Sequence, residues 1–217
     1  MLLKIRELVV QHMKNNLNKY IFLMLAFIIG VSTGAFTVNG LSVIQRDELS
    51  NYFQGFLQLL DYQKIDNGEL LRIAFFENIK IVLILWVLGI MIIGIPFIFL
   101  IIGIRGFIIG FSSGFIIKIM GLKGILFTLF ALVPKEIIII PCIIALGVYG
   151  INFSLNIFKS KSIKYLSKQS LKANFAAYCI VTAFFTGFIL LGVLVESYIT
   201  PVFIRMIAPL VTTALNF

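Results

Sequence analysis

The sequence predicts an all-α polytopic membrane helix bundle with about five transmembrane helices. Three observations carry this prediction: 60% of the 217 residues are hydrophobic, only 12% are charged, and the mean hydropathy is +1.08. A soluble domain has about a quarter of its residues charged, so half that share indicates a hydrocarbon solvent. We expect one integral membrane domain, 1–217, in which apolar runs alternate with short charged clusters.

A helix crosses the hydrocarbon core in about 20 residues, and five apolar runs are candidates for such spans. The expected spans are 20–41, 81–104, 106–120, 137–158 and 173–195. The third run is short and ends beside Lys118, so it spans only with tilt or local thinning of the bilayer. A re-entrant path for 106–136 is the alternative, but it would place the lysine-rich segment 159–172 outside, against the usual charge distribution.

The first span has a competing interpretation as a cleaved signal peptide. Thr33 and Ala35 follow an apolar stretch in the small-x-small pattern of a cleavage site. The apolar run nevertheless continues to Leu41, and the lead of 19 residues before it is long for the start of a signal peptide. A retained membrane anchor is therefore favoured.

Lysine and arginine gather in the short cytoplasmic loops of membrane proteins, and this rule sets the expected orientation. The lead, 1–19, contains four basic residues and the loop 159–172 contains five, whereas the loop 43–78 has six acidic residues against three basic ones. We expect the N-terminus and the lysine loop inside, and the acidic loop and the tail 197–217 outside. Arg105 is then expected at the inner turn between the second and third spans.

Small residues recur every four positions in the first and third spans. The two stripes are Ala26, Gly30 and Gly34, and Gly106, Gly110 and Gly114. Such stripes let two helix backbones approach closely in lipid, where no hydrophobic force drives helices together. Packing between helices of one chain is the favoured interpretation, and a homo-oligomer interface is the alternative.

The acidic loop contains an amphipathic helix. Its apolar positions follow helical spacing and are Leu49, Tyr52, Phe53, Phe56, Leu57 and Leu60. The opposite face lacks the lysines and arginines that attract a helix to anionic lipid. Its apolar face either rests on the rim of the bundle or docks an extracytoplasmic partner, and the sequence weighs the two equally.

Two prolines, Pro134 and Pro141, enclose Lys135 and Glu136 in an otherwise apolar stretch. Ionisable residues at membrane depth are costly and mark ion paths, whereas at an interfacial turn they are ordinary. Adjacent residues point to different faces of a helix, which argues against a relay formed by the two. We therefore expect a broken-helix turn over these four residues.

Signatures of other chemistry are missing from the sequence. It contains no Walker A, HExxH or GxSxG pattern, so we expect neither catalysis nor a cofactor. Cys142 and Cys179 lie in apolar runs without metal-ligand spacing, and His12 is the single histidine, so no metal site is expected. The basic clusters lack the interleaved aromatics of a nucleic-acid surface, which leaves the lipid bilayer as the expected environment.

Several short strings occur in a particular order along nearly the whole chain. They are Val38-Asn39-Gly40-Leu41, Trp86-Val87-Leu88-Gly89-Ile90, Gly94-Ile95-Pro96, Arg105-Gly106-Phe107, Gly110-Phe111, Gly114-Phe115, Gly121-Leu122-Lys123-Gly124, Pro134, Pro141, Phe153-Ser154-Leu155, and Glu196, Tyr198 and Pro201. In this order the chain resembles the stage II sporulation protein M family of integral membrane proteins. That family often has lysine at the position of Arg105 and neutral residues at the positions of Lys135 and Glu136, which argues against a general role for the latter two.

The resemblance implies a membrane scaffold of endospore-forming bacteria that acts during engulfment. It implies that the scaffold recruits and anchors two peptidoglycan hydrolases, stage II sporulation proteins D and P, for cell-wall remodelling. The location implied is the mother-cell side of the sporulation septum and the engulfing membrane. The alternative is a transporter or permease subunit, because wider relatives of the family occur in organisms that make no spores.

Overall fold

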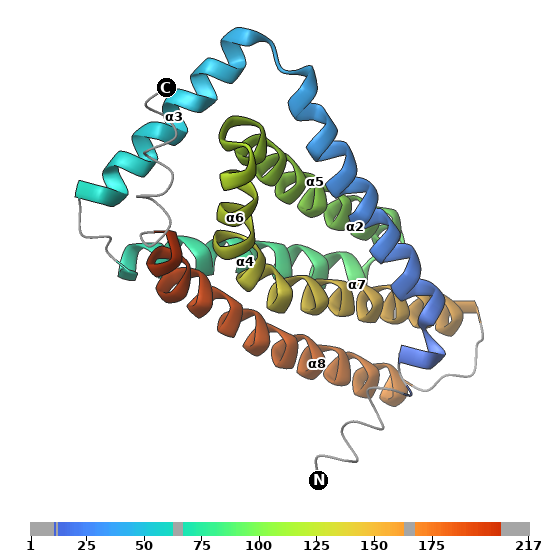
Figure 1. Cartoon of the computed structure of the whole chain (residues 1–217). Helices are drawn as coiled ribbons and strands as arrows, with labels where there is room; N and C mark the ends of the chain where they lie inside the picture. Colours follow the sequence, from blue (N-terminus) through green and yellow to red (C-terminus); the bar gives the residue numbers. More distant parts are fainter. Residues whose placement is uncertain (1–10, 12, 63–66, 163–167, 205–217) are drawn as a thin grey trace.

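The computed structural model describes residues 11, 13–62, 67–162 and 168–204, and the elements it forms there are helical. Along the chain they are α2 (Leu17–Thr37), the short helix η1 (Val38–Gly40), α3 (Val43–Tyr62), α4 (Asn67–Ile90), α5 (Gly94–Met120), α6 (Leu122–Ala131), α7 (Val133–Ser162), α8 (Lys168–Leu194) and the π-helical turn η2 (Val195–Ile199) (Figure 1). The all-α prediction is confirmed.

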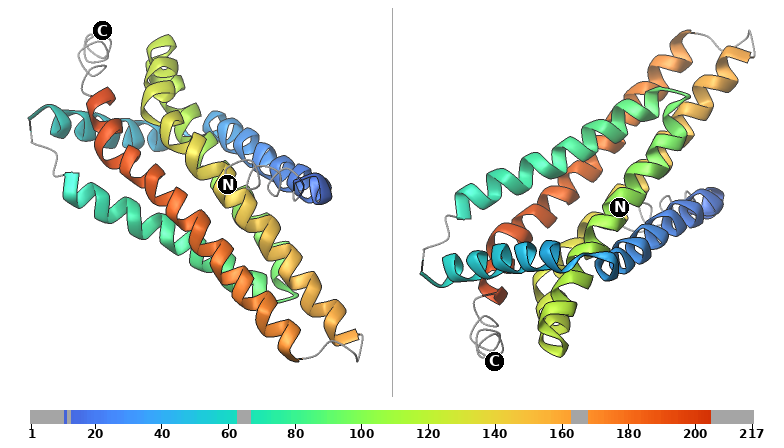
Figure 2. Two further views of the ribbon diagram at one scale, coloured as in Figure 1. Left: turned by 90° about the horizontal axis from the view of Figure 1, so that it is seen from below. Right: turned by 90° about the horizontal axis from the view of Figure 1, so that it is seen from above.

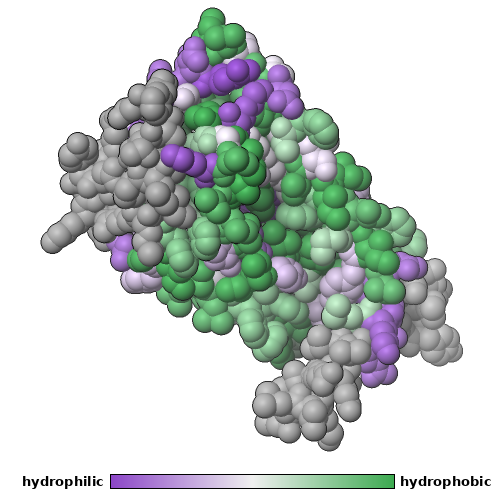
Figure 3. Space-filling model, viewed as in Figure 1, coloured by the Kyte–Doolittle hydropathy of each residue, from purple (hydrophilic) through white to green (hydrophobic). Residues whose placement is uncertain are grey.

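Five helical segments are long and apolar enough to cross a membrane. They are Leu17–Gly40, Asn67–Ile90, Gly94–Met120, Val133–Phe158 and Lys172–Ile204. Their outer faces carry large exposed apolar side chains such as Phe22, Ile28 and Ile180. The surface of a soluble protein rarely has so many of them. The space-filling view shows apolar side chains over the middle of one face and polar ones gathered over α3 (Figure 3). The predicted number of spans is confirmed.

The predicted boundaries of the second and third spans are wrong. α4 ends at Ile90 and α5 begins at Gly94, so the chain reverses inside the run 81–104 that was expected to be one span. Two residues allow this tight turn. A Cβ atom at Gly94 would overlap the carbonyl oxygen of Leu88. Pro96 has no N–H to donate to a preceding turn of helix. The residues that flank the turn are themselves apolar, so hydropathy alone could not reveal it. Residues 67–78, expected in the outer loop, extend the second span.

α7 is the central helix of the bundle. Of an 18-residue apolar stretch within its span, 67% of the residues are buried inside the chain, against 22% to 28% in the corresponding stretches of the other four spans. α4 and α8 run alongside α7, and α2 leaves this group at an angle (Figure 2). Fully buried apolar side chains fill the interior and come from several helices, among them Leu23, Leu85, Ile98, Ile139, Val148 and Ile189.

α2 and α5 run parallel and form the closest helix pair. The two glycine stripes face each other across this pair: a Cβ atom at Gly30 or Gly34 would overlap the carbonyl of Gly103 or Phe107, and one at Gly110 would overlap the carbonyl of Val31. The stripes therefore pack against each other within one chain, with backbones in direct contact. A homo-oligomer stays a prediction.

Polar contacts assign the connecting segments to the two ends of the bundle. At one end the Lys118 ammonium donates to the Val38 carbonyl (3.2 Å) and the Asn39 side-chain oxygen (2.9 Å). At the other end the Ser154 hydroxyl donates to the Met91 carbonyl (2.9 Å). We call the first the α3 end, because α3, α6 and η2 lie there, and the second the turn end. Which end faces the cytoplasm stays a prediction, and most of the predicted lead and tail lies outside the described residues.

Candidate functional site

A buried ion pair joins α5 to α7. Arg105 Nη2 lies 3.1 Å from Glu136 Oε1, and the two side chains are only 14% and 8% exposed. Arg105 is about 17 Å along α5 from its first residue, at the usual rise of a helix, so its predicted position at an inner turn is wrong. Charges at such a depth are expensive unless they are paired, and each member of this pair depends on the other.

The pair uses only part of its hydrogen-bonding capacity. It is joined by a single hydrogen bond from Arg105 to Glu136 Oε1. Among the described residues, Glu136 Oε2 and Arg105 Nε are both buried without a hydrogen-bond partner. A buried carboxylate oxygen without a donor is costly, so Glu136 Oε2 has an unmet need for a hydrogen-bond donor.

A second charged pair begins at Lys135, the residue before Glu136 on α7, and joins α7 to η2. The Lys135 ammonium donates to Glu196 Oε1 of η2, next to the α3 end. The adjacent side chains of Lys135 and Glu136 thus leave α7 on different faces, as helical geometry requires. The two pairs balance their charges separately.

The predicted broken-helix turn over Pro134–Pro141 is wrong, because all four residues lie inside α7. Pro134 occupies the first turn of the helix, where a missing N–H costs no intrahelical hydrogen bond. Pro141 lies farther along and removes one interior hydrogen bond without ending the helix. The chain instead changes direction at Leu132, between α6 and α7, and at Gly121, whose φ of 58° suits glycine.

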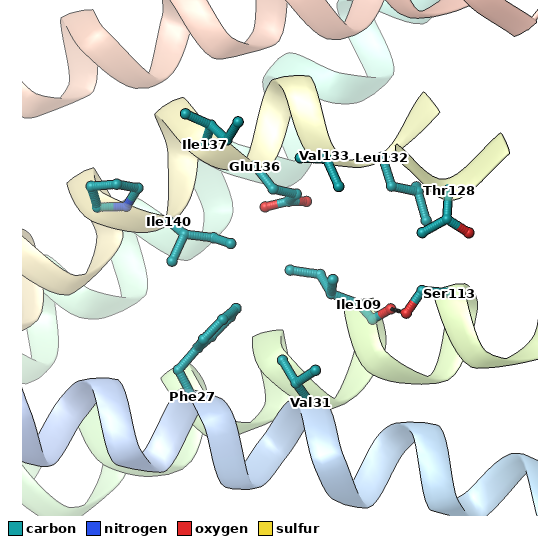
Figure 4. A pocket seen from close by; sticks show the side chains of 11 residues that line it. Phe27, Val31, Ile109, Ser113, Thr128, Leu132, Val133, Glu136, Ile137 and Ile140 are labelled. Carbon is teal, nitrogen blue, oxygen red and sulfur yellow. Dashed lines mark hydrogen bonds between the residues drawn. The ribbon is translucent and has the colours of Figure 1, made fainter. Parts of the chain in front are cut away.

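A pocket of about 500 Å³ lies beside the buried ion pair, between α2, α5, α6 and α7, and we call it the lateral pocket. Figure 4 shows the Glu136 carboxylate pointing from α7 into this space, toward Ile109 of α5 and Phe27 of α2. Except for Glu136, Ser113 and Thr128, its lining is apolar. The Ser113 hydroxyl is occupied, since it donates to the Ile109 carbonyl at 2.7 Å.

A second cavity of about 390 Å³ lies at the α3 end, and we call it the α3 groove. Tyr52 and Phe53 of α3 line it together with Phe127 of α6 and the Lys135–Glu196 pair. Phe53 packs edge-on against Phe127, with ring centroids 5.8 Å apart. One edge of the predicted amphipathic helix therefore rests on the bundle.

The rest of the predicted amphipathic face divides into two parts. Leu49 is half-buried like Phe53, whereas Tyr52 is 79% exposed although it lines the α3 groove. Val43 and Ile44, at the start of α3, are exposed as well. The side chains of Phe56, Leu57 and Leu60 lie outside the described residues.

Sequence reasoning missed the pairing of Arg105 with Glu136 and of Lys135 with Glu196. Arg105 stands alone between two apolar runs, which is also the pattern of a short loop, and its partner is 31 positions away. The signal that could have identified it was the balance of charge: an arginine and a glutamate inside apolar stretches each need an opposite charge. Within the described part of the chain, no group of three potential metal ligands comes together, and Cys142 and Cys179 are free thiols. His12 lies outside it.

Of the comparisons with known proteins, the one with protein families gives a match. No curated protein and no solved structure matches it. A family model described as "Stage II sporulation protein M" matches residues 23–201, a range that runs from α2 through all five spans to the α3 groove. With most of its length matched, including both ion pairs and both glycine stripes, the chain belongs to the stage II sporulation protein M family of sporulation membrane proteins.

Proposed function

We propose that this protein is a membrane scaffold that recruits and anchors the peptidoglycan hydrolases called stage II sporulation proteins D and P. Its place of action is the mother-cell side of the septal and engulfing membrane during sporulation. Family membership supports a role in sporulation, and the many exposed apolar side chains of the spans support a site in the membrane. The proposal further assigns the α3 end to the outside of the cell membrane, where cell-wall enzymes act.

The observation that carries the proposal is the exposure of α3. This helix runs from the end of α2 to the start of α4, away from the central helix (Figure 1). Its side chains Val43, Ile44 and Tyr52 are exposed. Phe53 packs against Phe127 of the bundle, and α3 forms one wall of the α3 groove. A supported helix with exposed apolar side chains beside a groove is the kind of surface that binds a partner protein.

A transporter or permease subunit is the competing proposal, and the buried Arg105–Glu136 pair is the feature that favours it. The lateral pocket beside this pair is nevertheless lined almost wholly by apolar side chains, such as Phe27, Val31 and Ile140. A polar solute would find few partners there, so the scaffold is preferred. Solute flux through the purified protein in liposomes would favour the permease.

We expect the double change Phe53→Ser and Phe56→Ser to abolish recruitment of the two hydrolases and block engulfment. Phe53 also packs on Phe127, so some loss of protein level accompanies this change. The single change Tyr52→Ser separates the two effects, because a side chain that is 79% exposed contributes little to the fold. Tyr52→Ser should accumulate normally and still reduce recruitment severalfold, measured by co-purification from sporulating cells.

The matched control is Asn51→Ser with Gln54→Ser, on the polar face of the same helix. This control should leave recruitment and engulfment unchanged. Normal engulfment in both Tyr52→Ser and the double phenylalanine variant would contradict the proposal, and the apolar face of α3 would then rest in the outer leaflet. A parallel loss of protein and engulfment in all variants would instead make α3 a structural support.

A further inference from the structure

We propose that the lateral pocket binds a neutral lipid whose head group ends in a hydroxyl, of which a diacylglycerol is the representative ligand. The ligand's hydroxyl would donate a hydrogen bond to Glu136 Oε2, and its acyl chains would lie along the apolar walls. This lipid site is separate from the α3 groove and goes beyond the scaffold function proposed above, which it does not require.

The Glu136 carboxylate is the group in the lateral pocket that needs a hydrogen-bond donor. The residue is only 6% exposed, its Oε2 has no hydrogen-bond partner among the described residues, and its carboxylate points into the lateral pocket (Figure 4). The free energy lost by leaving such an oxygen unpaired is recovered when a ligand supplies an O–H. A ligand that only accepts hydrogen bonds would gain nothing at this oxygen.

The charges around the pocket favour a neutral ligand over a charged one. The Arg105 guanidinium, bound to the other oxygen of Glu136, already neutralises the carboxylate. The nearby Lys135 and Glu196 neutralise each other. A cation would therefore meet no net negative charge. An anionic phosphate would lie beside the Glu136 carboxylate, with no cationic side chain among the described residues that line the pocket.

The size and walls of the pocket suit an aliphatic chain. About 500 Å³ falls in the range of sites for small organic ligands, and Phe27, Val31, Ile109 and Ile140 supply apolar walls from three helices. Ile137 lines the pocket and is 66% exposed, so the pocket opens sideways on the surface that faces the hydrocarbon. A lipid can enter from the bilayer without passing through water.

The test uses the full-length protein, purified without partners and placed in phosphatidylcholine nanodiscs with a photoactivatable diacylglycerol. We expect cross-links on peptides of α2, α5, α6 and α7, the helices that line the pocket. Unlabelled diacylglycerol should compete about tenfold better than its methyl ether, which lacks the donor, as expected for a hydrogen bond to a charged group. Equal competition by the ether, or better competition by a long-chain ammonium or a phosphatidic acid, would overturn the proposal.

Two substitutions in the pocket and one control outside it sharpen the test. Ile140→Trp fills the pocket and should reduce cross-linking severalfold, whereas Ile180→Trp, on a side chain of α8 that is 69% exposed, should not. Glu136→Gln keeps an acceptor for Arg105 and turns an N–H donor toward the pocket. It should therefore abolish the preference for the alcohol over the ether. Unchanged labelling in Ile140→Trp, or an unchanged preference in Glu136→Gln, would contradict the assignment of the site.

Discussion

Replacing Gly110 with leucine is expected to remove most of the folded protein from the membrane. A Cβ atom at Gly110 would overlap the backbone of Val31 in α2, and backbone atoms cannot move aside as a flexible side chain can. The two helices would have to separate along the whole seam and lose the close contacts that hold them in lipid. We expect a destabilisation of about 3 kcal/mol or more, typical of severe overpacking.

The measurement is the thermal stability and the yield of monodisperse protein in detergent. Gly187→Leu is the matched control, because nothing lies within 4 Å of a Cβ atom built at Gly187. The control should behave like the wild type. If the Gly110 variant accumulated as well as the Gly187 variant, the seam between α2 and α5 would have to be wrong.

The second large effect is expected from breaking the buried ion pair on one side. Arg105→Met leaves the Glu136 carboxylate buried without its counter-charge, and Glu136→Leu does the same to the guanidinium. Each change should cost about 3 to 5 kcal/mol, the usual penalty for an uncompensated buried charge. The double variant leaves no charge behind and should recover most of the loss.

The coupling energy of the pair follows from the free energies of unfolding of the wild type, the two single variants and the double variant, measured in the same detergent. Lys118→Met is the control for the loss of a basic side chain, because Lys118 binds a carbonyl and an amide oxygen rather than a carboxylate. It should cost only about 1 kcal/mol. Additive losses in the double variant would mean that Arg105 and Glu136 do not depend on each other.

Much of the fold could be predicted because lipid imposes simple rules on length and charge. The number of spans follows from apolar runs near 20 residues, and α3 follows from the helical spacing that begins at Leu49 and Phe53. The boundary at 91–93 could not be predicted in the same way. A tight turn between two apolar helices has the same hydropathy as the helices, and only Gly94 and Pro96 marked it.

Less of the candidate site could be predicted, since it depends on contacts between distant segments. The spacing of the prolines suggested a break at 134–141. In a helix as largely buried as α7, however, a proline removes one hydrogen bond and the neighbouring helices keep the helix intact. The pairing of Glu136 with Arg105 depends on how α5 crosses α7, which no local pattern encodes. The glycine stripes of α2 and α5 were visible in the sequence, and packing between helices of one chain was the favoured interpretation. That the two stripes contact each other could not be predicted from them.

Site-specific cross-linking in sporulating cells tests the scaffold most directly. A photoreactive amino acid placed at Tyr52, which is exposed on α3, should cross-link to stage II sporulation protein D or P. The same amino acid at Ile180, exposed on the lipid face of α8, should not. Cross-links to the hydrolases from Tyr52 alone are the result that the proposed function predicts. Their absence at Tyr52, while the protein is present in the engulfing membrane, would contradict it.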